Sequence, residues 1–352
     1  MNWENYVQKV VPYVAGEQPK DQNVIKLNTN ENPYSPAQGV AEVIRNFDCE
    51  ILRKYPDPNV SALVDILAQY HGLDNNQVFV GVGSDDVLAM SFLTFFHSEK
   101  PILFPDITYS FYDVWADLYR IPYECQTLDE NLCIKIEDYK KENGGIVLAN
   151  PNAPTGVMAE VSVLEEIIAA NRDSVVIIDE AYVDFGGASC VSLIEKYDNL
   201  LVVQTFSKSR SLAGMRIGYA MGSSKLIQYL NDVKFSFNSY TMNTLTIVAG
   251  VASMMDEAYF RENIAKVVAT RERTKLELAK LGFTFGDSKT NFIFATHKTV
   301  PAQEIFEALR KNKIYVRYWN KPRIANYLRI SIGTDEEMDK MLTFLATFLK
   351  QK

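Results

Sequence analysis

Three polar residues follow stretches of apolar sequence at short distances. Asp179 comes directly after the run 175–178, Lys208 follows the run 200–203 by a few residues, and Arg216 lies eight residues beyond Lys208. Continuous apolar runs of this kind are typical of parallel strands that are buried on both faces. Ligands of such sheets bind at the carboxyl ends of the strands. We therefore expect one site that contains a carboxylate, an amine and a guanidinium group.

These three groups match the chemical demands of one cofactor. A buried cationic ring nitrogen keeps its proton only beside a buried carboxylate. A lysine amine that attacks a carbonyl must spend time without its proton, which desolvation and a cationic neighbour both favour. A phosphate group needs an arginine, hydroxyl groups and the amides of a helix N-terminus. Pyridoxal phosphate (PLP) makes all these demands, so the sequence indicates a PLP enzyme in which Lys208 holds the cofactor as a Schiff base.

The composition is that of an ordinary globular protein. The chain has 352 residues, of which 47% are apolar and 23% are charged, and its net charge is −8. This length allows two domains with a large core. The acidic balance argues against a surface for nucleic acid or anionic membrane.

Neither a metal site nor a disulfide framework is expected. The four cysteines lack the close spacing of a zinc ligand set, and we interpret them as reduced thiols: Cys49, Cys125, Cys133 and Cys190. The three histidines, His71, His97 and His297, lie away from the polar motifs. The N-terminus does not resemble a signal peptide, and no run reaches the roughly 20 apolar residues of a membrane span. We expect a cytoplasmic protein.

The elements that would position the polar residues alternate along the chain. Apolar runs predict strands at 78–80, 102–104, 146–149, 175–178 and 200–203, and helical patterns predict helices at 59–71, up to about 96, from about 108 and at 160–171. Residues 1–35 look irregular, and 223–280 look mostly helical. The remainder predicts strands at 291–294, 314–317 and 327–332, with helices at 301–312 and 335–350. The pattern favours an α/β domain followed by a smaller α+β domain.

Three motifs at these strand ends resemble those of the fold-type I aminotransferases. The segment 207–218 (SKSRSLAGMRIG) is similar to their lysine motif, 179–182 (DEAY) to the motif that contacts the cofactor ring, and 150–156 (NPNAPTG) to their Asn-Pro-Thr-Gly turn. The order and spacing agree together, and the resemblance runs from about residue 10 to the C-terminus. It implies the α/β fold of PLP-dependent transferases, with a mostly parallel seven-stranded sheet flanked by helices and a smaller α+β domain. The implied domains are an N-terminal arm or lid at 1–30 that packs with the small domain, a large PLP-binding domain at 31–265 and a small domain at 266–352.

Within that superfamily, the chain most resembles the histidinol-phosphate aminotransferase family. The segments that carry this resemblance are 11–16 (VPYVAG), 27–33 (LNTNENP), 53–58 (RKYPDP) and 327–333 (YLRISIG). The resemblance implies transamination between L-histidinol phosphate and 2-oxoglutarate, giving imidazole-acetol phosphate and glutamate in histidine biosynthesis.

The resemblance also implies residue roles. Lys208 would move the proton between substrate and cofactor carbons, Asp179 would pair with the ring nitrogen, and Tyr182 would bind the phenolic oxygen. The phosphate would be bound by Thr205, Ser207, Arg216 and the amides of Ser84 and Asp85, and Tyr109 would stack on the ring. Each residue type also has an ordinary use, since a lysine can be a solvated helical residue, Asp179 a helix N-cap, and either tyrosine a core residue.

One position departs from the pattern of the aminotransferases. They place an asparagine directly before Pro-Thr-Gly, where it helps to hold the phenolic oxygen, but this chain has Ala153 there and Asn152 one residue earlier. We expect Asn152 to take the role through a shifted turn. Otherwise Tyr182 makes that contact alone.

Arginines suit a site that must accept both a phosphate and carboxylates. Arg329 resembles the carboxylate-binding arginine of these aminotransferases, and Arg317 suits the phosphate or the distal carboxylate. Tyr13 and Asn30 would line the substrate pocket. Tyr55 resembles a residue that reaches the cofactor phosphate of the neighbouring subunit, which implies a homodimer with shared active sites.

Other functions remain open on the same fold. A threonine-phosphate decarboxylase also handles an amino phosphate but releases carbon dioxide, and an aromatic or branched-chain aminotransferase is compatible with the many aromatic residues. A PLP-binding module of a transcription regulator would need an appended basic domain. We expect none here, because the first motif begins near residue 10 and the net charge is negative.

Overall fold

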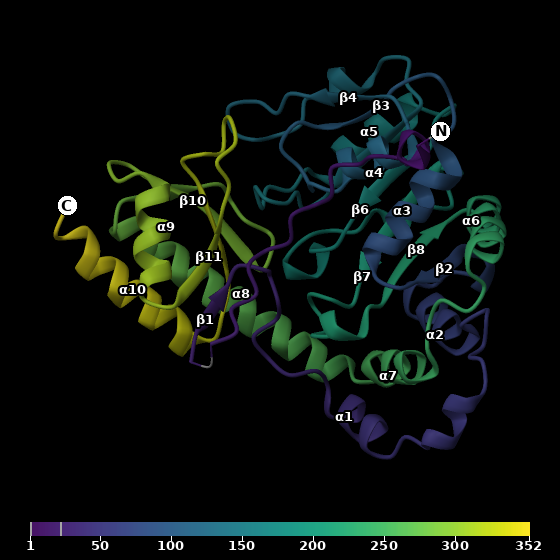
Figure 1. Ribbon diagram of the computed structural model, residues 1–352, viewed down its shortest axis with the longest axis horizontal. Helices are drawn as coiled ribbons and strands as arrows, with labels where there is room; N and C mark the ends of the chain where they lie inside the picture. Colours follow the sequence, from purple (N-terminus) through teal and green to yellow (C-terminus); the bar gives the residue numbers. More distant parts are fainter. Residues whose placement is uncertain (1, 22) are drawn as a thin grey trace.

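Two β-sheets organise the chain, which a computed structural model describes at residues 2–21 and 23–352 (Figure 1). The larger sheet has seven strands in the order β2-β8-β7-β6-β5-β3-β4. They are β2 (Val78–Gly81), β3 (Ile102–Pro105), β4 (Tyr123–Gln126), β5 (Gly145–Ala149), β6 (Val176–Asp179), β7 (Leu200–Thr205) and β8 (Gly218–Gly222). Only β8 among these strands runs antiparallel to its neighbours. The expected mostly parallel seven-stranded sheet is therefore confirmed.

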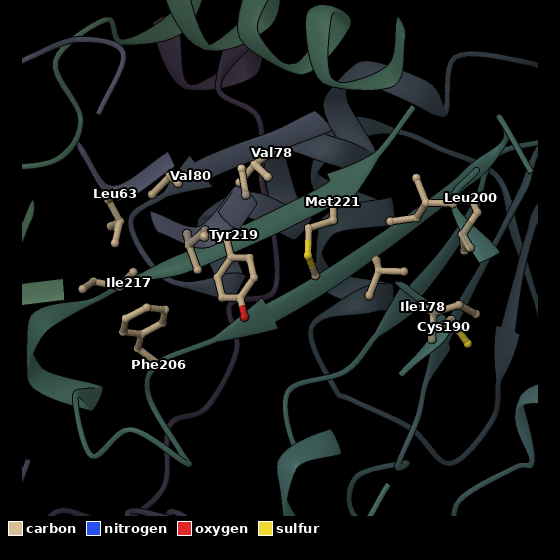
Figure 2. Packing of buried hydrophobic residues seen from close by; sticks show 14 of the residues in the cluster. Leu63, Val78, Val80, Ile178, Cys190, Leu200, Phe206, Ile217, Tyr219 and Met221 are labelled. Atoms are coloured by element: carbon tan, nitrogen blue, oxygen red, sulfur yellow. The ribbon is translucent and has the colours of Figure 1, made fainter. Parts of the chain in front are cut away.

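The central strands are apolar on both faces, as their continuous apolar runs predict. In β7, Leu200 and Val202 face one hydrophobic cluster, while Leu201 and Val203 face another on the opposite side. This alternation follows from the period of two in a strand. Figure 2 shows part of the first cluster, including Ile178 of β6 and Tyr219 and Met221 of β8.

Helices cover both faces of this sheet (Figure 1). They are α1 (Gln38–Arg45), α2 (Ser61–His71), α3 (Ser84–Phe95), α4 (Tyr112–Tyr119), α5 (Val161–Ala170), α6 (Ser224–Phe237) and α7 (Thr244–Met255). Short 3-10 turns complete the chain: η1 (Trp3–Tyr6), η2 (Cys49–Arg53), η3 (Asn75–Gln77), η4 (Ile136–Tyr139), η5 (Val183–Phe185), η6 (Cys190–Leu193) and η7 (Ala213–Met215). None of the helices in the described ranges is long and apolar enough to cross a membrane.

The second sheet has five strands in the order β1-β11-β12-β10-β9. They are β1 (Ile25–Leu27), β9 (Phe283–Phe285), β10 (Phe292–His297), β11 (Ile314–Tyr318) and β12 (Leu328–Ser331). The last three helices are α8 (Glu257–Lys280), α9 (Ala302–Lys311) and α10 (Asp335–Leu349), and they share a separate apolar core with this sheet. The predicted boundary between residues 265 and 266 falls inside α8, and the division into domains stays a prediction.

The N-terminal segment crosses between the two sheets before it enters β1 (Figure 1). On the side of the large sheet, the ring of Tyr13 stacks on Phe111 at 4.1 Å. On the other side, the carboxylate of Glu17 pairs with Arg310 of α9 at 2.8 Å. The segment is thus held at both ends, over the gap between the sheets.

Sequence patterns missed four strands. β1 and β9 have only three residues each, which is too short for a periodic pattern. β4 is an edge strand with three exposed residues, and β8 is flanked by glycines that weaken a strand signal. The helix expected from about residue 108 begins at Tyr112, because residues 106–111 form the turn that carries Tyr109.

Candidate active site

A cavity lies at the carboxyl ends of β5, β6 and β7, where the polar motifs were expected to meet. It is lined by Thr29, Glu31, Ser84, Asp85, Tyr109, Ala149, Pro151, Ala153, Asp179, Ala181, Tyr182, Ser207, Lys208, Ala213 and Arg216. Eight of these residues were predicted from the sequence. Four are alanines, and their small side chains leave room for a flat ring.

Asp179 ends β6 at the floor of this cavity. Its side chain accepts hydrogen bonds from the Tyr112 hydroxyl at 2.8 Å and from the Ala181 amide at 3.2 Å. Burial raises the pKa of this carboxyl group from 3.8 to about 6, although the bond from Tyr112 opposes the rise. A buried carboxylate in this state is stabilised by a cation placed against it.

Lys208 approaches the cavity from the turn that follows β7. Its ammonium group donates to the Thr29 carbonyl at 3.3 Å and lies 5.9 Å from the centre of the Tyr182 ring. The Tyr182 hydroxyl accepts a hydrogen bond from the Asn30 amide at 2.9 Å. Its own proton is therefore free to be donated into the cavity.

A cradle for an anion occupies the other end of the cavity. The N-terminus of α3 begins at Ser84, and the first amides of a helix have no partner within the helix. Arg216 donates to Asp85 at 3.0 Å and to the Ser207 hydroxyl at 3.4 Å. Asp85 also accepts from Tyr109 at 2.7 Å, so the cradle and Tyr109 are fixed relative to each other.

A second cavity adjoins the first and contains the predicted substrate-binding residues. It is lined by Tyr13, Gly16, Asn28, Thr29, Asn30, Thr108, Tyr109, Ser110, Ala153, Pro154, Tyr182, Lys208, Arg317, Trp319 and Arg329. Arg329 donates to the Asn28 carbonyl at 3.0 Å, while its Nε is buried without a partner in the described structure. Desolvation lowers the pKa of this guanidinium group. An unpartnered buried donor of this kind suits an incoming anion.

The N-terminal segment forms the roof of this second cavity. Arg317 donates to the Val14 carbonyl at 3.2 Å. At Gly16 the backbone comes so close that a Cβ atom would lie 2.8 Å from Thr29 Cγ2 and 3.2 Å from Arg317 Nη1. A glycine is therefore needed for the segment to pass over the arginine.

Comparison with known proteins assigns this arrangement to a family. The sequence matches the family aminotransferase class I and II over residues 22–345. The chain belongs to this family. Among curated aminotransferases, histidinol-phosphate aminotransferase of Lactococcus lactis subsp. cremoris (strain SK11) is 53% identical over 352 residues, which are 100% of this chain and 99% of that protein. The protein of the same name from Clostridium botulinum (strain Langeland / NCTC 10281 / Type F) is 52% identical over 96% of this chain and 95% of its own.

Solved aminotransferase structures confirm the fold. The crystal structure of histidinol-phosphate aminotransferase from Sinorhizobium meliloti in complex with pyridoxal-5'-phosphate has a TM-score of 0.88 and 23% identity, and the match covers 97% of this chain and 96% of that one. At that identity the likeness concerns the fold alone. The expected fold-type I architecture and membership of the aminotransferases are both confirmed.

Two predicted cofactor ligands of this aminotransferase do not reach the cavity. Asn152 is turned away: its amide donates to the Ile107 carbonyl at 2.9 Å and to Thr155 at 3.0 Å, and its oxygen accepts from Thr108 at 2.8 Å. The prediction that Asn152 replaces the usual asparagine was wrong, because these bonds hold the turn together and Ala153 lines the cavity instead.

Thr205 lies behind Ser207 rather than in the cavity wall. Its hydroxyl accepts from the Ser207 amide at 3.1 Å and donates to the Ile217 carbonyl at 3.1 Å. The expectation that Thr205 itself reaches the cavity is therefore corrected, because its hydroxyl is bonded to Ser207 and Ile217 instead.

Tyr55 lies outside both cavities of this chain. Its side chain is 81% exposed and stacks on Tyr240 with ring centres 4.6 Å apart. A residue that serves the neighbouring subunit would be exposed in a single chain, so the position leaves that prediction open.

Sequence reasoning overlooked Tyr112 and Trp319. Tyr112 comes three residues after Tyr109, a spacing that places it on the following helix with its hydroxyl against Asp179. Trp319 follows Arg317 by two residues in the sequence, and this alternation puts both residues on one side of the strand. Both signals were present, but aromatic residues are too common in this chain for either to stand out.

A glycine on β8 tests the anion cradle. Gly218 pairs with Gly81, and a Cβ atom on it would overlap the backbone of Gly83 and Ser84. Gly218→Ala is expected to displace the start of α3 and to weaken cofactor retention at least about 10-fold, since two or more hydrogen bonds to the anion would lengthen. The fraction of bound PLP after gel filtration measures this. Gly214→Ala is the matched control, because nothing lies within 4 Å of its added atom, and equal retention in both variants would contradict the prediction.

Proposed function

We propose that the protein uses PLP to transfer the amino group of L-histidinol phosphate to 2-oxoglutarate, forming imidazole-acetol phosphate and glutamate. This is a transamination of histidine biosynthesis, and we place it in the cytoplasm. The observation that carries the proposal is the 53% identity with a histidinol-phosphate aminotransferase over the full length of this chain. The site geometry supports the proposal independently of that name.

The residues of the first cavity fit PLP. Asp179 is a carboxylate whose pKa burial raises, and a protonated pyridine nitrogen would stabilise its charged form. Tyr182 offers a hydroxyl to the phenolic oxygen, and Tyr109 and Ala181 also line the cavity. The cradle of Ser84, Ser207 and Arg216 fits the phosphate. Lys208 would hold the aldehyde carbon covalently.

The proposed mechanism assigns proton transfer to Lys208. Bound PLP supplies an electron sink for the substrate carbon that bears the amino group. The Lys208 amine, freed when the substrate amine binds, would take the proton from that carbon and hold it for return. Its bond to the Thr29 carbonyl keeps the amine near the cavity shared with Arg329. Asp179, which accepts a hydrogen bond from Tyr112, would hold the proton on the ring nitrogen.

Arg317 and Arg329 are proposed to bind the anionic end of each substrate in turn. Neither guanidinium group has a carboxylate within salt-bridge distance among the described residues, and both line the second cavity. Histidinol phosphate would present its phosphate here and glutamate a carboxylate. Guanidinium groups accept both anions through paired hydrogen bonds.

We further propose a homodimer in which Tyr55 binds the cofactor phosphate of the partner subunit. The support is the exposed aromatic pair of Tyr55 and Tyr240, since exposed apolar patches mark interaction surfaces. Tyr55→Phe is expected to raise the dissociation constant for PLP about 10-fold, the value of one charge-assisted hydrogen bond. Equilibrium titration of the apoprotein with PLP measures it.

A tyrosine on the opposite edge of the large sheet supplies the control for Tyr55. Tyr123→Phe in β4 removes the hydroxyl of another exposed tyrosine, from a strand that does not line either cavity. It should leave PLP affinity unchanged. An unchanged affinity in Tyr55→Phe as well would refute the shared site.

A single-turnover absorbance experiment tests the proposed function. The PLP form is mixed with histidinol phosphate, and separately with glutamate, phenylalanine and threonine phosphate. Rapid loss of the PLP band with histidinol phosphate, and its return on addition of 2-oxoglutarate, is the expected result. Carbon dioxide release from threonine phosphate without a response to histidinol phosphate would move the protein to the decarboxylase function. A response to phenylalanine alone would indicate an aromatic aminotransferase.

A further inference from the structure

Two arginines face each other across neighbouring strands of the small sheet. Arg317 of β11 and Arg329 of β12 are direct cross-strand partners in the antiparallel register. Like charges in this position destabilise a sheet. Burial lowers the pKa of the Arg329 guanidinium group, and the positive charge of Arg317 lowers it further, so both add to the cost. A pair of this kind needs something that holds both groups in place before a substrate anion arrives.

The side chain of Trp319 contacts both of them. Its ring centre lies 5.2 Å from the guanidinium carbon of Arg317 and 5.1 Å from that of Arg329. A cation within about 6 Å of a tryptophan ring is attracted by the negative face of the ring, and tryptophan is the strongest aromatic residue in this respect. One ring therefore offsets part of the repulsion between two cations without neutralising either, whereas a carboxylate in its place would compete with the substrate.

The tryptophan is itself anchored on the far side. It packs against a small apolar cluster formed by Ile107, Leu128, Phe294 and Ile324. The loop that follows it is tied to the large sheet, because Arg323 pairs with Asp106 and donates to the Leu128 carbonyl at 2.8 Å. The ring is held between two parts of the protein, and such support fixes the geometry of a site.

We propose that Trp319 is a positioning residue that orients Arg317 and Arg329 for the anionic end of the substrate and so determines affinity for phosphate- and carboxylate-bearing substrates. The identity of the substrates rests on the proposed function, whereas the role of the Trp319 ring does not. Trp319 acts through the arginines and not on the reacting carbon. Its loss should therefore raise KM and leave kcat nearly unchanged.

The test compares three variants of the holoenzyme. Trp319→Leu removes the aromatic face, Trp319→Phe keeps a weaker one, and Tyr327→Leu disturbs the same apolar cluster, although Tyr327 does not line the second cavity. The first readout is the dissociation constant of glutarate, an unreactive dianion, from its effect on the PLP absorbance. The second is KM and kcat for glutamate and for histidinol phosphate.

Trp319→Leu is expected to weaken glutarate binding and to raise both KM values about 10-fold, which corresponds to the two cation–π contacts, while kcat changes less than about 3-fold. Trp319→Phe should lie between the wild type and the leucine variant. An unchanged glutarate affinity in Trp319→Leu would overturn the proposal. So would an equal loss in Tyr327→Leu, because the cluster and not the ring would then be responsible. If glutarate binding weakens as expected but histidinol phosphate is not a substrate, the proposed function fails and the role of Trp319 stands.

Discussion

Lys208→Ala is expected to lower the rate of amino-group transfer at least about a thousand-fold. The substitution removes both the proposed covalent attachment of the cofactor and the only amine among the residues that line the first cavity. General acid–base catalysis by a positioned side chain contributes about 10²- to 10⁴-fold, and loss of the covalent route adds to this. The structure places the amine next to the Thr29 carbonyl. In the variant, a solvent molecule would have to occupy this position and accept the proton in its place. Stopped-flow decay of the PLP band with histidinol phosphate measures the rate.

The cofactor should nevertheless bind to this variant. The cradle formed by Ser84, Ser207 and Arg216 does not depend on the lysine. Borohydride should fix PLP to the wild-type chain and to Lys225→Ala, an exposed lysine on α6, but not to Lys208→Ala. Covalent fixation in Lys208→Ala at the wild-type level would show that another lysine holds the cofactor.

Asp179→Asn is expected to act in opposite directions on activity and on stability. A neutral amide cannot keep the pyridine nitrogen protonated, and we expect kcat to fall about 10²-fold or more. The apoprotein, however, should become more stable near pH 7. It no longer buries a carboxylate whose charged form is opposed by desolvation.

The effect of Asp179→Asn on the free energy of unfolding should depend on pH. Burial raises the pKa of Asp179 from 3.8 to about 6, so between these values the folded apoprotein binds more protons than the unfolded chain. The contribution of Asp179 to stability therefore falls as the pH rises through this window, and the penalty is complete above about pH 6. The difference between Asp179→Asn and the wild type should be near zero at pH 4 and on the order of 2–3 kcal/mol at pH 7.

Urea unfolding of the two apoproteins from pH 4 to pH 8 measures this difference. The neighbouring Glu180, whose pKa burial raises to about 7, titrates in both proteins and cancels in the comparison. Asp173→Asn, at an exposed position, should show no such trend. A variant that is less stable than the wild type at pH 7 would contradict the account of Asp179, and saturation with PLP should reverse the order, because the cofactor stabilises only the carboxylate form.

Residues at the strand ends could be placed from the sequence because two regular features fix them. A continuous apolar run marks a strand that is buried on both faces, and parallel connections bring all the carboxyl ends to one edge. Asp179 and Lys208 lie in one cavity for this reason, and Arg216 joins them because it precedes β8, which runs antiparallel to β7. The relation between β11 and β12 was less accessible, because the register that sets Arg317 opposite Arg329 depends on pairing between strands and not on a pattern within one of them.

The errors also have physical reasons. The turn at 150–156 has several polar side chains that can bond to the same backbone groups. The sequence alone does not determine which of them forms these hydrogen bonds. The side-chain amide of Asn152 donates to the Ile107 carbonyl and to the Thr155 hydroxyl, and these bonds turn it away from the cavity. Likewise, the sequence gives no sign that Thr205 faces Ser207, since both hydroxyls lie at the end of the same strand.

The way in which the N-terminal segment covers the arginines has a consequence for how this protein can vary. Arg317 and Arg329 bond to the main-chain carbonyls of Val14 and Asn28, and every amino acid supplies a carbonyl. Val14 is also largely exposed. Mutational drift at that position should therefore be tolerated. Gly16 differs, because any side chain there would press against Thr29 and Arg317. Purifying selection along this segment should fall on a residue that has no side chain, while the apolar residues around it are free to diverge.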